Sequence, residues 1–495
     1  MEEPGIEHVS RMALRGGVAK LLSQGGNFAL RLAFMVILAR LLEPEDFGLV
    51  AMVTVVTAFL DLFTTAGLSM AAVQKSTITN DQVSTLFWIN ILVGFLLATT
   101  CLLIAPALVA FYHEPRLFWV TATIGIGFIF NAAGAQHVAM LQRRLRYVTL
   151  AAIEFSCQFV SLGTGVIVAL LGYRYWALVA AAVSLPACIT VCVWVANAWI
   201  PSLPRRNADI WSLLHFGGTI TLNAVVSYAT YNFDKFVLGR VWGASALGYY
   251  GVASQLINIP TSNLNTAVGG VMFSALSRVQ HDLERFKRYF LAGYSLNISL
   301  TLPITIFSAV FADDIIFVVL GPKWTDAAGL FRLLTPTVLV FGIVNPLGWL
   351  LWSSGRHVRS LQLSFLIGVV VVAGCLIGLP YGARGVAMGF SGAMLLLLLP
   401  IIVWCLHGTN ISLTDLLRTA SRPLVSALVA TAFAFAADYY LSSQPHFEFV
   451  PFVGEAVVMA IVYPCMLLFV MGQKQFYFDL LKTFIKAPAP SSDTA

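Results

Sequence analysis

Long apolar segments, each about 20 residues in length, recur along almost the whole chain and leave only short polar connections between them. An apolar run of this length spans the hydrocarbon core of a bilayer as an α-helix. The pattern predicts about 14 such helices, over residues 17–41, 47–70, 85–110, 117–140, 148–172, 175–199, 213–238, 247–274, 289–312, 329–353, 360–380, 384–406, 421–441 and 451–472. We therefore expect an all-α polytopic membrane protein, with no loop long enough for a separate enzymatic domain.

Composition and charge agree with this interpretation and add an orientation. Hydrophobic residues make up 59% of the 495 residues and charged residues only 11%, which excludes a soluble enzyme. Most of the 29 Lys and Arg residues fall in alternate connections and at both termini, so the positive-inside rule predicts that both termini are cytoplasmic. We expect no cleaved signal peptide. The net charge of +6 is thus a topology signal and does not indicate a nucleic-acid partner.

Motifs for catalysis, cofactors or metals do not emerge from the chain. All seven cysteines fall in apolar runs without a CxxC pair, which predicts small core residues rather than a disulfide framework or a zinc site. The eight histidines lack metal-ligand spacing, and neither a Walker A nor a Rossmann fingerprint occurs in a usable context. We expect no catalytic residue, no cofactor and no metal.

Two short stretches, residues 36–52 and 237–252, share a frame at an offset of 200 residues. Leu38, Arg40 and Gly48 in the first correspond to Leu238, Arg240 and Gly248 in the second. Six predicted helices separate them, an even number, so both copies enter the membrane in the same direction. This predicts two six-helix lobes related by a pseudo-twofold axis along the membrane normal, with a site between them. We expect lobes over residues 1–205 and 206–410, followed by two extra helices and a cytoplasmic tail over 411–495.

Polar side chains inside the predicted spans follow helical spacing. Residues at steps of three and four share one face of a helix, which predicts a wet stripe on the first span and another on the seventh. The substrate-binding candidates are Lys20, Gln24, Asn27 and Arg31 on the first span, and Asn223, Ser227, Asp234 and Lys235 on the seventh. Two acids, Asp61 and Glu154, are candidates for ion coupling.

Each of these charges has a structural alternative, because a charge inside the membrane is either functional or paired. Arg31 suits a cavity ligand or a structural ion pair. Asp234 and Lys235 lie near a helix end, where side chains reach toward the interface. Glu154 suits a proton site or a buried hydrogen-bonded acid.

The first half of the chain carries the residues of a known family. LARLL from Leu38, Pro44, the pair Phe47-Gly48, Gly67, Gln74 and STLFW from Ser84 are followed by NFDKFVLGRVWGASALGYYGVASQL from Asn232 and FSALSR from Phe273. These stretches resemble the polysaccharide-transporter branch of the multidrug/oligosaccharidyl-lipid/polysaccharide exporter superfamily. One departure is Thr64-Thr65-Ala66, where many relatives have an acidic residue.

The resemblance implies a flippase that moves undecaprenyl-pyrophosphate-linked oligosaccharide units across the inner membrane for exopolysaccharide, capsule or O-antigen assembly, as in lipopolysaccharide biosynthesis. Arg31 and its neighbours would then neutralise the pyrophosphate in a cationic central cavity that opens alternately to each side. Membrane lipids, a polysaccharide polymerase and chain-length machinery are the expected partners. Two other hypotheses are a cation-coupled multidrug exporter of the same superfamily and a membrane-embedded polysaccharide polymerase or ligase.

Overall fold

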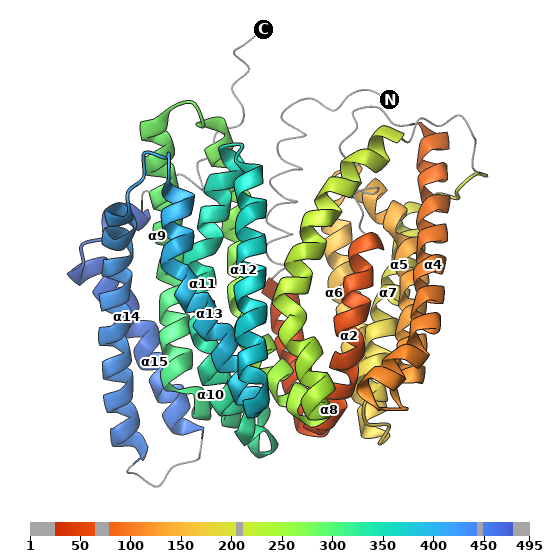
Figure 1. Ribbon diagram of the computed structural model, residues 1–495, viewed down its shortest axis with the longest axis horizontal. Helices are drawn as coiled ribbons and strands as arrows, with labels where there is room; N and C mark the ends of the chain where they lie inside the picture. The colour runs from red at the N-terminus through yellow and green to blue at the C-terminus, as the bar shows by residue number, and fades with distance from the viewer. Residues whose placement is uncertain (1–24, 65–78, 204–210, 443–448, 479–495) are drawn as a thin grey trace. The chain divides into compact units, whose positions relative to one another are not determined.

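The computed structural model describes residues 25–64, 79–203, 211–442 and 449–478, and helices dominate all four segments (Figure 1). The helices comprise residues 25–41, α2 (Pro44–Thr64), α4 (Asn80–Tyr112), α5 (Leu117–Arg143), α6 (Tyr147–Leu170), α7 (Trp176–Asn197), α8 (Trp211–Arg278), α9 (Leu283–Val310), α10 (Ala312–Leu320), η1 (Pro322–Trp324), α11 (Thr325–Ser353), α12 (His357–Gly378), η2 (Leu379–Tyr381), α13 (Gly382–Leu406), α14 (Leu413–Ser442), α15 (Val450–Cys465) and the π-turn η3 (Met466–Val470). Each predicted span overlaps one of these helices. The expected all-helical fold is confirmed, and no strand occurs in the four segments.

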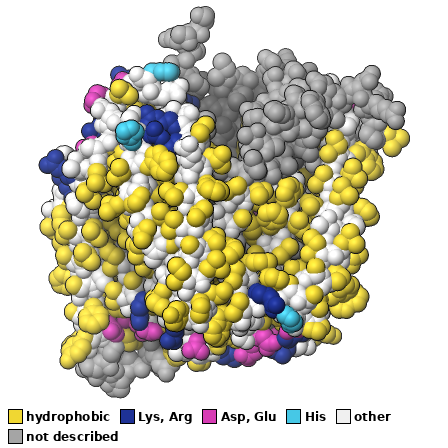
Figure 2. All heavy atoms as spheres, viewed as in Figure 1, with side chains coloured by type: hydrophobic (Ala, Val, Ile, Leu, Met, Phe, Trp, Pro, Cys, Tyr) yellow, Lys and Arg dark blue, Asp and Glu magenta, His cyan; other side chains and the backbone are white. Residues whose placement is uncertain are grey.

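Ten stretches of the described residues are long and apolar enough to cross a membrane, and one of them, Val358–Leu406, joins α12 to α13. Many large apolar side chains on these helices are exposed, such as Leu103 at 74% and Val195 at 78%. Figure 2 shows the visible face covered by hydrophobic side chains, with charged side chains gathered near helix ends. An exposed apolar surface of this extent suits lipid rather than water as its surroundings.

The first of two compact units spans Met1–Gly251. Within it α4 packs against α5, and both α5 and α6 pack against α7. Glycines make the close approaches possible: a Cβ atom added at Gly94 would lie 2.8 Å from the Phe128 carbonyl oxygen, and one at Gly134 would lie 2.8 Å from Thr190 Oγ1. Small residues take this role in membrane helices because backbones must come close for dispersion forces to hold the helices together.

The second unit spans Val252–Ala495. Helix α11 packs against α9 and α13, α12 against α13, and α14 against both α9 and α15. The α12–α13 seam is a glycine contact, since a Cβ atom at Gly378 would lie 2.0 Å from the Gly385 carbonyl oxygen and one at Gly389 would lie 2.1 Å from that of Gly374. Spacing of four residues puts Gly374 and Gly378 on one face of α12, which explains this packing.

Helix α8 contains both of the spans predicted at 213–238 and 247–274. The two arms meet at Gly243, whose φ of 79° and ψ of −173° break the helix. A positive φ strongly favours glycine, so this residue sets the corner between the arms. The first arm and the start of the second belong to the first unit, and the remainder of the second arm belongs to the second unit.

Two connections differ from the sequence-based expectation. The loop expected between residues 313 and 329 contains α10 and η1; α10 has only 9 residues, too few to appear as a span, but it buries Ile315, Ile316 and Leu320. Helix α14 begins at Leu413 rather than near 421. Its first turns are polar and therefore invisible to hydropathy, and Ser412 and Asp415 cap them with reciprocal backbone-to-side-chain hydrogen bonds of 2.9 and 3.2 Å.

Candidate functional site

The two repeat copies meet at the glycines that they share. A Cβ atom at Gly48 would lie 1.7 Å from the carbonyl oxygen of Ala244, and a Cβ atom at Gly248 would lie 1.8 Å from that of Pro44. The offset of 200 residues converts Gly48 into Gly248 and Pro44 into Ala244, so the contact is reciprocal. This is the pattern of a local twofold axis, in which residue i contacts j and j contacts i. Leu38 and Leu238, at matching positions, are both fully buried.

The first polar stripe lies only in part within the described residues. Lys20 and Gln24 lie outside them, whereas Asn27 and Arg31 are on the helix formed by residues 25–41. Asn27 is half-buried and Arg31 is exposed. This helix approaches α6 closely, because a Cβ atom at Gly26 would lie 2.9 Å from the Phe155 ring. Arg31 therefore presents a guanidinium outside the packed core.

Asp61, near the end of α2, is held by two neighbours. Its Oδ1 accepts hydrogen bonds from Thr64 Oγ1 at 2.7 Å and from Asn131 Nδ2 of α5 at 3.4 Å. The side chain is half-buried. Asn131 was not predicted, although an amide in the middle of an apolar run is a signal that could have found it.

The second stripe, on α8, divides between contrasting environments. The side chain of Asn223 lies outside the described residues, and Ser227 is half-buried. Lys235 donates from Nζ to Asn232 Oδ1 at 3.1 Å along the same helix. Asp234 is only 3% exposed, and its Oδ2 accepts a 2.5 Å hydrogen bond from the Tyr250 hydroxyl, which ties the two arms of α8 across Gly243.

The structure joins the helices of two predicted residues, Asp61 and Asp234, whereas Glu154 lies apart from them in sequence and on another helix. Tyr228 of α8 donates to the Val55 carbonyl oxygen of α2 at 2.9 Å, which joins the helix of Asp234 to that of Asp61. Glu154 is exposed on α6 rather than buried. Two cavities of about 570 and 670 Å³ contain none of the predicted residues; the smaller is almost wholly apolar and lies among α5, α6 and α7.

Charges at the N-terminal end of α2 form an ionic cluster with the α4–α5 and α6–α7 connections. Arg116 pairs with Glu45 at 2.6 Å and with Glu114 at 2.7 Å, and Arg174 pairs with the buried Asp46 at 3.3 Å. Hydrogen bonding to Arg116 lowers the pKa of Glu114 below its usual range. Acids in the first turn of α2 also complement its dipole. The acids Glu45, Glu114 and Asp46 thus balance the charges of Arg116 and Arg174.

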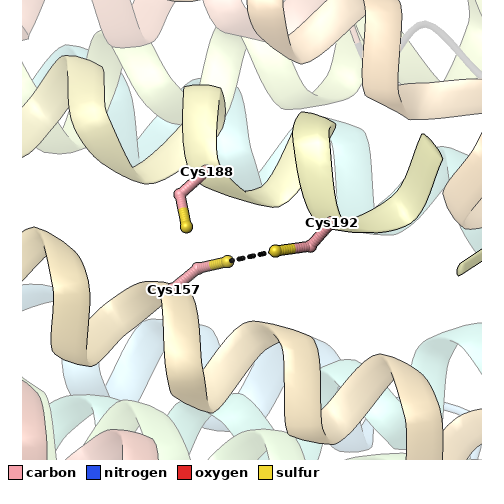
Figure 3. A group of neighbouring side chains, drawn as sticks. All are labelled: Cys157, Cys188 and Cys192. Atoms are coloured by element: carbon pink, nitrogen blue, oxygen red, sulfur yellow. Dashed lines mark hydrogen bonds between the residues drawn. The ribbon is translucent and has the colours of Figure 1, made fainter. Parts of the chain in front are cut away.

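Three of the seven cysteines converge, which spacing alone could not reveal. Cys157 of α6 points toward Cys188 and Cys192 of α7, with the three Sγ atoms within 4.8 Å of one another (Figure 3). The Cys157 and Cys192 sulfur atoms are 3.8 Å apart. Such a donor set suits a soft metal ion in chemical terms. Three thiolates within a membrane span would be costly, however, and we interpret the group as neutral thiols that pack α6 against α7.

Comparison with known sequences gives a consistent picture. A family model described as "Polysaccharide biosynthesis protein" matches residues 37–329. The chain is 25% identical to the lipopolysaccharide biosynthesis protein WzxC of Escherichia coli (strain K12), over 73% of this chain and 74% of that protein. It is 24% identical to the succinoglycan biosynthesis transport protein ExoT of Rhizobium meliloti (strain 1021), over 66% of this chain and 65% of that one.

Solved structures share the fold. The lipid II flippase MurJ in an inward closed conformation superimposes with a TM-score of 0.72, at 15% identity, over 94% of this chain and 100% of that one. An inward-facing multidrug resistance MATE family transporter of the MOP superfamily gives a TM-score of 0.60, at 15% identity, over 77% of this chain and 93% of that one. At 15% identity these similarities show the fold alone, which is the all-helical fold of these transporters.

Proposed function

Since the chain belongs to the polysaccharide biosynthesis protein family, and a relative such as ExoT is named as a transport protein rather than an enzyme, we propose that it is a flippase for undecaprenyl-pyrophosphate-linked oligosaccharide repeat units. The units would pass from the inner to the outer leaflet of the bacterial inner membrane for assembly into exopolysaccharide, capsule or O antigen. Both termini lie in the cytoplasm in this proposal, in keeping with the distribution of Lys and Arg.

The observation that carries the proposal is the reciprocal contact between the two repeat copies. Gly48 meets Ala244 and Gly248 meets Pro44 through backbone atoms alone. A backbone seam of this kind can open and re-form without rotamer changes in the four residues that make it. We propose that this seam closes the outer side of a cationic cavity between the lobes 1–205 and 206–410, and that it parts when the transporter opens outward.

The substrate would need cationic and polar partners because a pyrophosphate cannot cross hydrocarbon unaccompanied. Arg31 supplies an exposed guanidinium, which binds phosphate oxygens in a bidentate fashion. The remaining proposed contacts are Lys20, Gln24, Asn27, Asn223, Ser227, Asp234 and Lys235. Asp61 and Glu154 are the proposed ion-coupling acids. Membrane lipids surround the lipid tail, and a polymerase with its chain-length machinery would consume the exported units.

Substitution at Arg31 tests the substrate-binding role. Arg31→Ala should reduce surface polysaccharide at equal protein level by roughly tenfold or more, because a charge-assisted phosphate contact contributes about 1.5–3 kcal/mol. Arg31→Lys should retain part of the output, since it keeps the charge but loses the planar fork. Arg278→Ala, in the exposed last turn of α8, is the matched control and should leave output unchanged.

Unchanged output in Arg31→Ala would remove Arg31 from the substrate path. A deletion strain separates the proposal from the multidrug-exporter hypothesis. Deletion of a multidrug exporter would be expected to lower resistance to cationic drugs. We expect deletion to abolish surface polysaccharide and to leave drug resistance as it was.

A further inference from the structure

A cavity of about 670 Å³ with a strongly charged lining lies in the second unit, and none of the residues proposed to contact the substrate lines it. Its walls are the first turns of α9 and of α14, and the segment that follows η3 closes it. Its volume falls in the range of about 300–1,000 Å³ that is typical of small-ligand sites. The cavity is therefore large enough to hold a headgroup or a small anion.

Four cationic side chains line this cavity against two acidic ones, and the acids already have partners. Asp415 accepts an ion pair from Lys287 at 2.7 Å, and Glu284 accepts a hydrogen bond from Asn410 at 3.0 Å. The Lys287–Asp415 pair also joins α9 to α14, which keeps the two walls at a fixed spacing. The acids are thus engaged before any ligand arrives.

The other three cations are Arg288 of α9 and Arg418 and Arg422 of α14. Within the part of the chain that the structure describes, no ion pair or hydrogen bond is made by any of their three guanidinium groups. Arg418 and Arg422 are four residues apart and so share one face of α14, while Arg288 is on the opposite wall. The cavity consequently holds a surplus of positive charge that converges from both sides.

We infer that this cavity, which we name the α9–α14 arginine pocket, binds a phosphate-bearing headgroup. Arginine forks match the oxygens of phosphate, and three of them balance more than one negative charge, which exceeds what a single carboxylate carries. Leu291 and Phe476 add an apolar side to the lining, suited to the first carbons of a lipid chain. Basic pockets between membrane helices bind anionic lipids in this way.

The pocket does not depend on the proposed transport activity, since it shares no residue with the proposed substrate path. The same phosphate chemistry could come from an anionic phospholipid or from a free anion, and inorganic pyrophosphate separates the two sources. Binding of cardiolipin, phosphatidylglycerol and phosphatidylcholine to the purified full chain in detergent can be measured by native mass spectrometry. Thermal stabilisation by each lipid, and by inorganic pyrophosphate, gives a second readout.

Wild-type protein should retain cardiolipin in preference to phosphatidylcholine. The triple variant Arg288→Gln, Arg418→Gln, Arg422→Gln should bind cardiolipin roughly tenfold more weakly or worse. Arg285→Gln is the matched control, because Arg285 is on the same helix, is exposed and pairs with Asp282 at 3.1 Å outside the cavity. It should bind as wild type does. Competition by pyrophosphate would identify a free anion as a second source, and its absence would identify a lipid headgroup.

Equal cardiolipin binding by wild type and the triple variant would overturn the inference, as would an equal loss in Arg285→Gln. Should the triple variant fail to fold, the triple replacement of the same arginines by Lys keeps the charge and removes the forks. That variant is expected to bind with intermediate affinity, and wild-type affinity in it would also contradict a site built on arginine geometry.

Discussion

The two copies of the repeat keep the same packing positions but carry different chemistry. Leu38 and Leu238 are both fully buried, and Gly48 and Gly248 form the reciprocal backbone contact. Elsewhere the copies diverge: at the offset of 200 residues, Phe34 corresponds to the buried carboxylate Asp234. Packing has therefore been preserved across the repeat where backbones meet, while the buried carboxylate Asp234 has no polar counterpart in the first copy.

The corners that precede the two glycines differ in the same way. The first corner has the acids Glu45 and Asp46, which are paired with Arg116 and Arg174. At the offset of 200 residues Ser245 and Ala246 stand in their place, and the second corner turns at Gly243, which has a positive φ. One corner is thus fixed by charges and the other by backbone conformation. The two copies thus meet in a twofold contact although ion pairs hold one corner and a glycine conformation sets the other.

The largest expected effect comes from breaking the seam itself. Gly248→Ala places a methyl group 1.8 Å from the Pro44 carbonyl oxygen, so the two backbones would have to separate, at a cost of about 1–3 kcal/mol. We expect roughly a tenfold or greater loss of polysaccharide export at equal protein level. Gly251→Ala, three residues further along the same arm, meets nothing within 4 Å and should export normally.

Gly48→Ala offers the reciprocal experiment, because its methyl group would lie 1.7 Å from the Ala244 carbonyl oxygen. It should lose export to the same extent as Gly248→Ala. Normal export by either variant would show that the seam is not required to close, and unequal losses would argue against a twofold contact.

The polar asymmetry between the copies should have the next largest effect. Asp234→Ala removes the buried acceptor of the Tyr250 hydroxyl and so loses this hydrogen bond, at a cost of about 0.5–1.5 kcal/mol. We expect a severalfold fall in export. Phe34→Leu, at the matching position of the first copy, conserves an apolar side chain and should have little effect. Comparable losses of export in Asp234→Ala and Phe34→Leu would mean that any change at these matched positions lowers export, whether or not the side chain is charged.

A smaller effect is expected at the hydrogen bond that joins the copies away from the seam. Tyr228→Phe removes the donor to the Val55 carbonyl oxygen but keeps the ring beside Phe59, with centroids 6.2 Å apart. We expect a loss of stability of about 1 kcal/mol, measured as a fall in the midpoint of thermal unfolding in detergent. Tyr173→Phe, exposed after α6, is the control. An unfolding midpoint that falls in Tyr173→Phe but not in Tyr228→Phe would contradict a stabilising role for the hydrogen bond from Tyr228 to Val55.

The smallest effect is expected at the ionic corner, and it should depend on pH. Arg116 lowers the pKa of Glu114, so their pairing stabilises the folded state above the ordinary Glu pKa of about 4.3 and is lost as the pH falls through the lowered value. Arg116→Gln should lower the unfolding midpoint by roughly 1–2 °C at pH 7, and the difference should shrink as the pH falls below the ordinary Glu pKa of about 4.3. A difference independent of pH would point to packing instead of charge.

Hydropathy predicted the helices well because lipid imposes a minimum apolar length on every span. It missed α10 and the first turns of α14, where a segment is too short or too polar to register. The repeat was recognisable from Gly48 and Gly248, since the contact is made by backbone and tolerates no side chain. The contacts of Gly48 with Ala244 and of Gly248 with Pro44 could not be predicted, because the spacing of residues within one helix does not show which other helix packs against it.

The polar site was harder to predict for the same reason. Periodicity placed Asp61 and Asp234 on faces of their helices, but their partners Asn131 and Tyr250 come from elsewhere in the chain. The convergence of Cys157 with Cys188 and Cys192 depends likewise on the packing of α6 against α7. Sequence patterns therefore identify the polar groups whose burial in a membrane costs free energy. Only the fold shows which residues form hydrogen bonds with them.

The central claim is that this chain moves a lipid-linked oligosaccharide from the inner to the outer leaflet. The most direct measurement is the leaflet distribution of that intermediate in a deletion strain, determined by labelling its sugars from outside intact spheroplasts. The account predicts accumulation on the cytoplasmic leaflet, inaccessible to the label, with wild type and Gly251→Ala restoring export and Gly248→Ala failing to do so. Accumulation on the outer leaflet would contradict the account and would indicate a defect in polymerisation.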